Sequence, residues 1–143
     1  MKIGELAQIA QTTVETVRYY EKEGLLPETT RTAENFRVYG AAHQERLRFI
    51  RNCRALDMSH EEIRTLLGLT DQPAEGCGAI NALFDQHMAH VDERISELTH
   101  LKAQLATLRQ RCQTERAVDA CGILQGLAAM PAHTKPERHT HLG

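Results

Sequence analysis

The sequence predicts a mainly α-helical protein with several short helices, one small hairpin and one long helix. Three observations support this fold class. The 143 residues are rich in Leu, Ala, Glu and Arg, with 4% aromatic residues and no Trp, a composition that favours helices over a β-sandwich. Short helical periods occupy most of the first 70 residues and are interrupted by turns and by one non-helical stretch. Apolar residues then recur at helical spacing throughout 78–112.

Two short helices are expected first. Residues 3–10 place their apolar side chains on one face, and the turn at 11–13 provides an N-cap for a helix over 14–23. Gly24 suits the C′ position of this second helix, and Pro27 follows as a stop. Two short helices joined by a tight turn form the helix-turn-helix pattern.

The second helix carries side chains suited to base edges and phosphates. Val17 and one of the two tyrosines are expected to pack inward. The candidate DNA-contacting residues of this segment are Thr13, Thr16, Arg18, Tyr19 and Tyr20.

A small hairpin is expected between 27 and 39, where the helical period disappears. Apolar and polar side chains alternate over residues 36–39, as they do in a strand. Arg31 and Arg37 lie at the two bases of the hairpin, which resembles a wing that binds phosphates. The segment 31–54 holds six arginines against two acids, although the formal net charge is −2. A basic patch on a mildly acidic protein fits DNA contact through one face, the alternative being a solvated helix face.

Two further helices complete an N-terminal domain over 1–70. The first, over 43–56, buries a stripe of Leu47, Ile50, Cys53 and Leu56, which makes Cys53 a small core residue. The second runs to Leu69 and opens on a capping box of Ser59 and Glu62. A linker over 71–77 follows.

The longest element is expected from Gly78 to about Arg111. Its apolar residues recur at spacings of three and four and form a narrow seam: Val91, Ile95, Leu98, Leu101, Leu105, Leu108 and Cys112. Such a helix cannot bury itself alone, so 78–112 is interpreted as a dimerisation helix in a coiled coil. A loop and short helix over 113–130 and a flexible, His-containing tail over 131–143 end the chain.

The chain carries no sign of membrane targeting. Its apolar stretches are far shorter than a bilayer requires, and the start lacks the apolar core of a signal peptide. A cytoplasmic location is expected, where four cysteines indicate thiols or metal ligands. No paired redox cysteines, nucleotide-binding glycine loop or carboxylate–histidine layout stands out, so the protein is not expected to be an enzyme.

Several segments together resemble the MerR family of metal-responsive transcription activators. The resemblance covers roughly residues 1–125 and is carried by Ile3-Gly4-Glu5-Leu6-Ala7, Val14-Glu15-Thr16-Val17-Arg18-Tyr19-Tyr20-Glu21, Gly24-Leu25-Leu26-Pro27, Arg37-Val38-Tyr39, Phe49-Ile50-Arg51 and Leu56-Asp57-Met58-Ser59. The chain is most similar to the cadmium- and lead-responsive branch (the CadR and PbrR type). That closer match rests on Arg51-Asn52-Cys53-Arg54, Cys77-Gly78, Cys112 and Cys121-Gly122-Ile123-Leu124.

The resemblance implies a homodimer that binds double-stranded promoter DNA through a winged helix-turn-helix. In such a dimer Thr16, Arg18 and Tyr19 would touch DNA, together with Arg31, Asn35, Arg37 and Tyr39 of the wing region. It also implies that the metal-bound dimer untwists an operator between widely spaced promoter elements, so that RNA polymerase can use both.

Three cysteines are the candidate metal ligands: Cys77, Cys112 and Cys121. Thiolates select soft cations, with Cd(II) or Pb(II) expected and Hg(II) or Zn(II) as alternatives. A continuous helix over 78–111 would place Cys77 roughly 50 Å from Cys112 of the same chain. An antiparallel dimer could instead join Cys77 of one subunit to Cys112 and Cys121 of its partner. A thiol redox sensor, with Cys112 and Cys121 as a disulfide, is a further alternative.

A second, weaker metal site is a hypothesis for the histidines. His87 and His90 lie near the start of the long helix, and His133, His139 and His141 belong to the tail. Solvated helix and tail histidines are the simpler interpretation.

Overall fold

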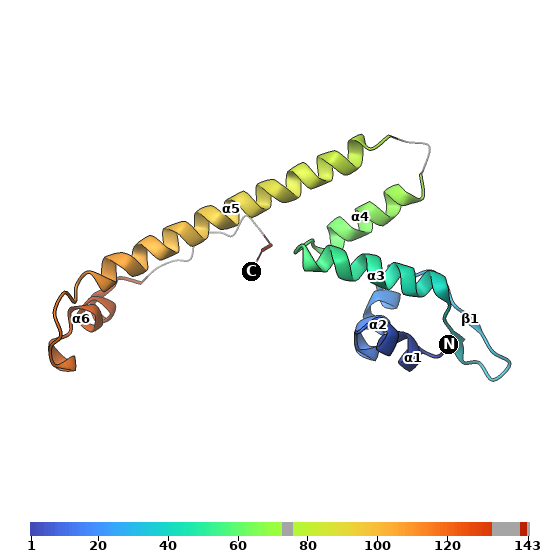
Figure 1. The fold of residues 1–143 in the computed structure, drawn as a ribbon, viewed down its shortest axis with the longest axis horizontal. Coiled ribbons are helices and arrows are strands. Elements are labelled where there is room, and N and C mark those ends of the chain that lie inside the picture. The colour runs from blue at the N-terminus through green and yellow to red at the C-terminus, as the bar shows by residue number, and fades with distance from the viewer. Residues whose placement is uncertain (73–75, 133–140, 143) are drawn as a thin grey trace. The chain divides into compact units, whose positions relative to one another are not determined.

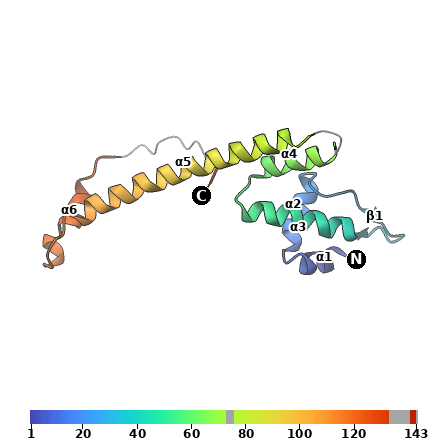
Figure 2. The same cartoon turned by 45° about the horizontal axis from the view of Figure 1, so that its top comes forward.

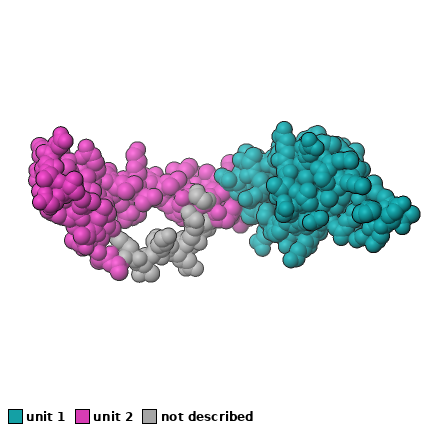
Figure 3. Space-filling view, turned by 90° about the horizontal axis from the view of Figure 1, so that it is seen from below, with its two compact units in different colours: residues 1–83 teal, residues 84–143 magenta. Residues whose placement is uncertain are grey.

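The computed structural model describes residues 1–72, 76–132 and 141–142. The chain forms two compact units, residues 1–83 and residues 84–143, coloured separately in Figure 3.

The first unit holds four short helices and one hairpin, which confirms the mainly α-helical winged fold (Figure 1). Strands β1 (Thr30–Arg31) and β2 (Arg37–Val38) pair antiparallel, with Thr30 opposite Val38. The helices are α1 (Ile3–Ile9), α2 (Val14–Lys22), α3 (Ala41–Ala55) and α4 (His60–Thr70).

The turn between α1 and α2 fixes the helix-turn-helix. Gln11 adopts a left-handed conformation with a φ of 55°, which turns the chain back. Thr13 is the N-cap of α2, and its side chain accepts a hydrogen bond of 3.1 Å from the Thr16 amide. The chain leaves α2 through Gly24, whose φ of 73° favours glycine.

One hydrophobic core joins the helices of the first unit. Its fully buried side chains come from α1, α2, α3, α4 and two connecting segments: Leu6, Val17, Leu25, Ile50, Met58 and Ile63. Each such burial stabilises the fold by about 1.5–3 kcal/mol. Ile80 and Leu83, at the start of the next helix, also pack on this core. The first unit therefore extends beyond the predicted linker.

The stripe predicted for α3 is correct except at its end. Leu47, Ile50 and Cys53 are buried, so Cys53 is a core residue as expected, and burial raises the pKa of its thiol. Leu56 is 62% exposed, against expectation. It is the C-cap residue of α3, where the backbone leaves the helix and the side chain no longer follows the buried face.

The long helix α5 (Gly78–Arg109) is unbroken over 32 residues (Figure 2). Beyond it, η1 (Val118–Ala120) and α6 (Gly122–Ala129) complete the second unit. α6 lies against the last turns of α5, where a Cβ on Gly126 would be 3.0 Å from Leu108 Cδ2. Within the described residues, no helix is long and apolar enough to span a bilayer.

Candidate DNA interface and metal centre

An open groove lies between α2 and the hairpin formed by β1 and β2, here called the wing. Four of the side chains around it are cationic, and no Asp or Glu is among its described lining residues: Lys2, Ile3, Arg18, Arg31, Asn35, Phe36, Arg37 and Tyr39. The cationic lining is the electrostatic character that a phosphate backbone requires.

The exposed face of α2 carries most of the predicted contacts. Arg18 is exposed, and Tyr19 is 43% exposed. Thr13 and Thr16 share a hydrogen bond of 2.9 Å between their hydroxyls. Of the two tyrosines, Tyr20 packs inward against the core, and burial raises the pKa of its phenol. Arg18 and Tyr19 are therefore the α2 side chains best placed to meet DNA.

The tip of the wing is ordered by its own side chains. Asn35 adopts a left-handed conformation with a φ of 67°, which Asn tolerates better than most residues. Arg31 Nη1 donates to Asn35 O at 3.1 Å and to its Oδ1 at 3.3 Å. The Lys2 ammonium lies 5.4 Å from the ring centroid of Phe36. These contacts fix where the wing can present Arg31 and Asn35.

Glu21, a residue of α2, connects this helix to the wing. Its carboxylate accepts hydrogen bonds from the Arg37 guanidinium and the Tyr39 hydroxyl. Tyr39 is only 2% exposed, and burial together with the Glu21 carboxylate raises its phenol pKa. Its hydroxyl donates to Glu21, and Tyr39 also lines the groove, so a DNA contact by this residue stays a prediction. Arg37 is 45% exposed at its side chain and remains able to meet a phosphate.

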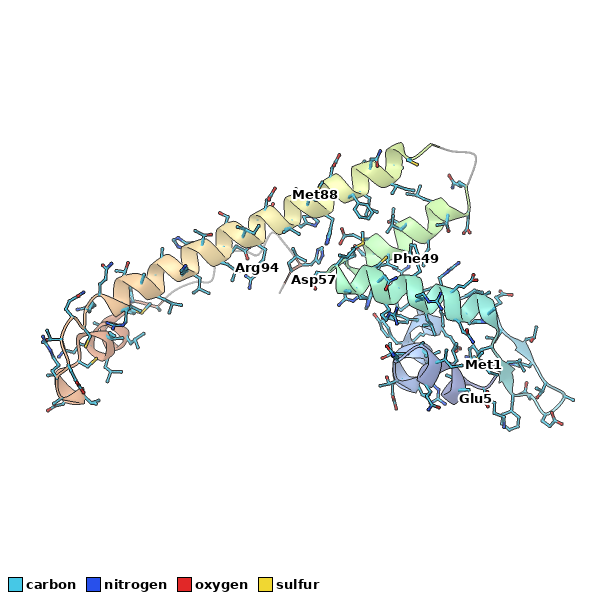
Figure 4. The ribbon with its side chains drawn as sticks, viewed as in Figure 1. Met1, Glu5, Phe49, Asp57, Met88 and Arg94 are labelled. Carbon is cyan, nitrogen blue, oxygen red and sulfur yellow. The ribbon has the colours of Figure 1, made fainter. Side chains whose placement is uncertain are left out.

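Two functional candidates were missed by sequence reasoning, Glu21 and His60. At the start of the chain, Met1 (labelled in Figure 4) accepts at its carbonyl oxygen a hydrogen bond of 2.8 Å from Tyr39 N. His60, the first residue of α4, contacts the Tyr19 hydroxyl through Nδ1 at 3.2 Å. The sequence offered no signal for either contact, because each joins residues far apart in the chain.

Two of the predicted metal ligands lie together in the second unit. Cys112 follows α5, and Cys121 is the N-cap residue of α6. Both are half-buried free thiols. The backbone amides of Leu124 and Ile123 at the start of α6 lower the pKa of the Cys121 thiol, and the neighbouring Cys112 side chain acts in the same direction. An N-cap thiolate beside a second thiol fits a soft cation, since thiolates are its preferred ligands.

Cys77 is exposed and immediately precedes α5. A 32-residue helix is about 48 Å long at 1.5 Å per residue, so the two ends of α5 are far apart. The seam along α5 is exposed over most of its length, with Leu105 at 59%. An unpartnered apolar seam of this length is typical of a dimerisation helix.

Three of the five candidate histidines cluster in the second unit. His87, His90 and His141 each place a ring nitrogen within 4.8 Å of the others. Their ring centroids are 5.2–6.5 Å apart. His133 and His139 lie outside the described residues. Neutral imidazole nitrogens at such spacing are able to share one transition-metal ion.

A helix-turn-helix with a basic wing groove and a long helix defines a DNA-binding transcription regulator. Two family models match: one described as MerR HTH family regulatory protein over residues 1–69, and one described as MerR, DNA binding over residues 44–108. The chain belongs to the MerR family. Its relatives are regulators, which confirms the expectation that it is not an enzyme.

Three known proteins illustrate the relationship. The HTH-type transcriptional regulator ZntR homolog of Haemophilus influenzae is 48% identical over 111 residues, 78% of this chain and 82% of that protein. The mercuric resistance operon regulatory protein of Bacillus cereus is 32% identical over 126 residues, 88% and 96% of the two chains. The transcription regulator PbrR691 from Ralstonia metallidurans, solved in complex with lead(II), is 51% identical with a TM-score of 0.79, covering 89% of this chain and 98% of that one.

Proposed function

We propose that this protein is a metal-responsive activator that binds promoter DNA as a homodimer and switches on heavy-metal resistance genes. The observation that carries the proposal is the pair of adjacent thiols, Cys112 and Cys121, at the end of a long helix with an exposed apolar seam. The family membership supports DNA binding. The 51% identity to a regulator solved with lead(II) supports a soft-metal effector.

Promoter DNA would be bound by α2 and the wing of each protomer. Arg18 and Tyr19 face solvent from α2, and Arg31 and Asn35 form the ordered tip of the wing. Thr13 and Thr16, which cap the helix, lie at its N-terminal end, where backbone amides favour phosphates. Tyr20 and Tyr39 pack inward and support this surface from the side of the hydrophobic core.

The dimer would form through the α5 seam in an antiparallel coiled coil. Pairing buries the exposed apolar residues from Val91 to Leu105. It also brings the start of one α5 to the end of the other. Cys77 of one subunit would then join Cys112 and Cys121 of the second copy, and each dimer would hold two three-thiolate sites. Within one chain, the length of α5 prevents this arrangement.

Cd(II) or Pb(II) is the proposed effector. Three thiolates without a described fourth ligand suit trigonal Pb(II), or Cd(II) with a borrowed oxygen or nitrogen. Hg(II) and Zn(II) remain alternatives, and a mercuric resistance regulator is among the relatives. A thiol redox sensor built on Cys112 and Cys121 is the less favoured candidate, because it leaves Cys77 without a role.

Metal binding would act through the position of Cys77. This residue follows the DNA-binding helices and directly precedes α5. Coordination of one ion by Cys77 and the partner's thiols would stabilise one dimer conformation relative to another. The stabilisation equals the difference in metal-binding free energy between the two conformations. The favoured shape would distort the operator so that RNA polymerase can use both promoter elements.

His87, His90 and His141 are proposed as a second, weaker metal site. Their clustered ring nitrogens support it, and His90 Nδ1 is buried with no described hydrogen-bond partner. Metal stoichiometry tests this site separately. Two ions per subunit for the intact chain, and one for His90→Ala, would support it, whereas one ion for both would remove it.

An ultraviolet titration tests the thiolate site. Reduced protein is titrated with Cd(II), Pb(II), Hg(II) and Zn(II), alongside Cys77→Ser and the matched core control Cys53→Ser. Thiolate-to-metal charge-transfer bands that saturate and are weakened by Cys77→Ser but not by Cys53→Ser support the shared site. Equal bands for Cys77→Ser and the wild type would refute the intersubunit arrangement. A promoter response to peroxide rather than to metal would favour the redox sensor.

A further inference from the structure

His60, the first residue of α4, lies beside the exposed face of α2. The proposed function gives this residue no role. Its Nδ1 is 3.2 Å from the Tyr19 hydroxyl. Its ring lies 5.3 Å from the Tyr19 ring and 5.9 Å, edge to face, from the Tyr20 ring. The imidazole is thus held by two aromatic neighbours and bonded to the one α2 phenol that faces solvent.

The Tyr19 hydroxyl has a single proton to donate. A neutral His60 with its ring proton on Nε2 accepts a hydrogen bond from the Tyr19 hydroxyl at Nδ1. The hydroxyl then cannot donate to a phosphate at the same time. A protonated His60 carries hydrogens on both nitrogens. Nδ1–H then donates to Tyr19 Oη, and the phenol hydrogen is released toward DNA.

We propose that His60 is a proton-linked positioning residue of the DNA interface: neutral His60, in the tautomer with its proton on Nε2, withholds the Tyr19 hydroxyl, and protonated His60 orients it to donate to a backbone phosphate. The proposal rests on the proposed DNA contact of Tyr19. It makes DNA binding and proton uptake by His60 mutually favourable, because a phosphate near the ring stabilises the imidazolium.

The charged groups around His60 fit this linkage. Burial and the Arg54 guanidinium lower its pKa in the free protein, and Arg64 acts in the same direction. Glu23, the C-cap residue of α2, opposes them, but its carboxylate already accepts a hydrogen bond of 3.0 Å from Arg64. A cationic ring at the first residue of α4 is further disfavoured by the helix dipole. A bound phosphate supplies the negative charge that this environment lacks.

The sign of the pH dependence follows. Because the surroundings of His60 lower its pKa in the free protein and bound DNA would raise it, DNA binding takes up protons in the interval between the two pKa values. Affinity therefore rises as pH falls through that interval. A fully linked group changes the affinity by up to about tenfold per pH unit for each protomer.

Fluorescence anisotropy of a labelled duplex tests the proposal. The probe is a duplex selected by the wild-type protein from a random-sequence library, measured from about pH 7.5 to about pH 5.5 at constant ionic strength. Wild-type affinity is expected to rise by about threefold to tenfold per pH unit for each protomer at the lower end. His60→Gln should lose most of this rise, whereas the matched control His100→Gln, on an exposed turn of α5, should keep it. Tyr19→Phe should bind less tightly than the wild type at low pH and also lose the rise.

Two results separate this proposal from the proposed function. If Tyr19→Phe weakens binding but His60→Gln and the wild type have the same pH profile, the proton linkage is wrong and the DNA contact stands. If Tyr19→Phe and Arg18→Ala both bind as the wild type does, the proposed DNA surface itself is wrong. An NMR titration of the wild-type imidazole avoids any folding defect of the variants: a His60 pKa that does not rise on adding the duplex overturns the linkage.

Discussion

Removing the Glu21 carboxylate is expected to weaken the whole DNA-binding unit, because this side chain joins α2 to the wing. Glu21 is 13% exposed at its side chain and accepts from Arg37 and Tyr39. The Arg37 side chain is 45% exposed, so that ion pair is screened and contributes about 1 kcal/mol at most. The Tyr39 hydroxyl is buried, and leaving it without a partner costs about 1–3 kcal/mol. Glu21→Ala should therefore lower the free energy of unfolding by about 1–4 kcal/mol.

Urea unfolding at a fixed protomer concentration measures this change, with Glu28→Ala on an exposed position as the matched control. A double-mutant cycle with Tyr39→Phe isolates the buried contact. Replacing both partners should cost about 1–2 kcal/mol less than the sum of the two single changes, because no buried donor is then left unsatisfied. Equal midpoints for Glu21→Ala and Glu28→Ala, or strict additivity in the cycle, would refute this account of how the wing is held.

Three further outcomes are expected. Leu101→Glu combined with Leu105→Glu places two charges on the exposed α5 seam and should yield a monomer by sedimentation; an unchanged dimer would move the interface elsewhere. Gly24→Ala forces a Cβ into a left-handed conformation and should cost about 1–2 kcal/mol of stability in urea unfolding, whereas Gly68→Ala, in the last turn of α4 with open space around it, should gain up to about 1 kcal/mol. Arg18→Ala should weaken DNA binding and reduce the salt slope of log K by about 1, and an unchanged slope would argue against a phosphate contact.

Local patterns were sufficient to predict the elements of this fold. Apolar spacing set the helices, Thr13 and Ser59 marked two helix starts, and Gly24 marked an end, because caps and periodicity act within a few residues of the chain. The same reasoning identified Cys53 as core and Cys112 and Cys121 as neighbours in a loop. The prediction that Leu56 is buried was wrong. At the end of a helix the side chain no longer points to the face that its spacing predicts.

Contacts between distant segments were decided only by the tertiary structure. Periodicity cannot show that the Glu21 carboxylate accepts a hydrogen bond from the buried Tyr39 hydroxyl, because 18 positions separate the two residues. Nor can it show that His60 meets Tyr19, since 41 positions separate them and no local rule couples one helix to the other. The sequence by itself determined which residues are chemically able to bind DNA and metal. The packing of α2 against the wing and α4 decided which of them face solvent and which are already engaged, because a side chain with one donor cannot serve two partners at once.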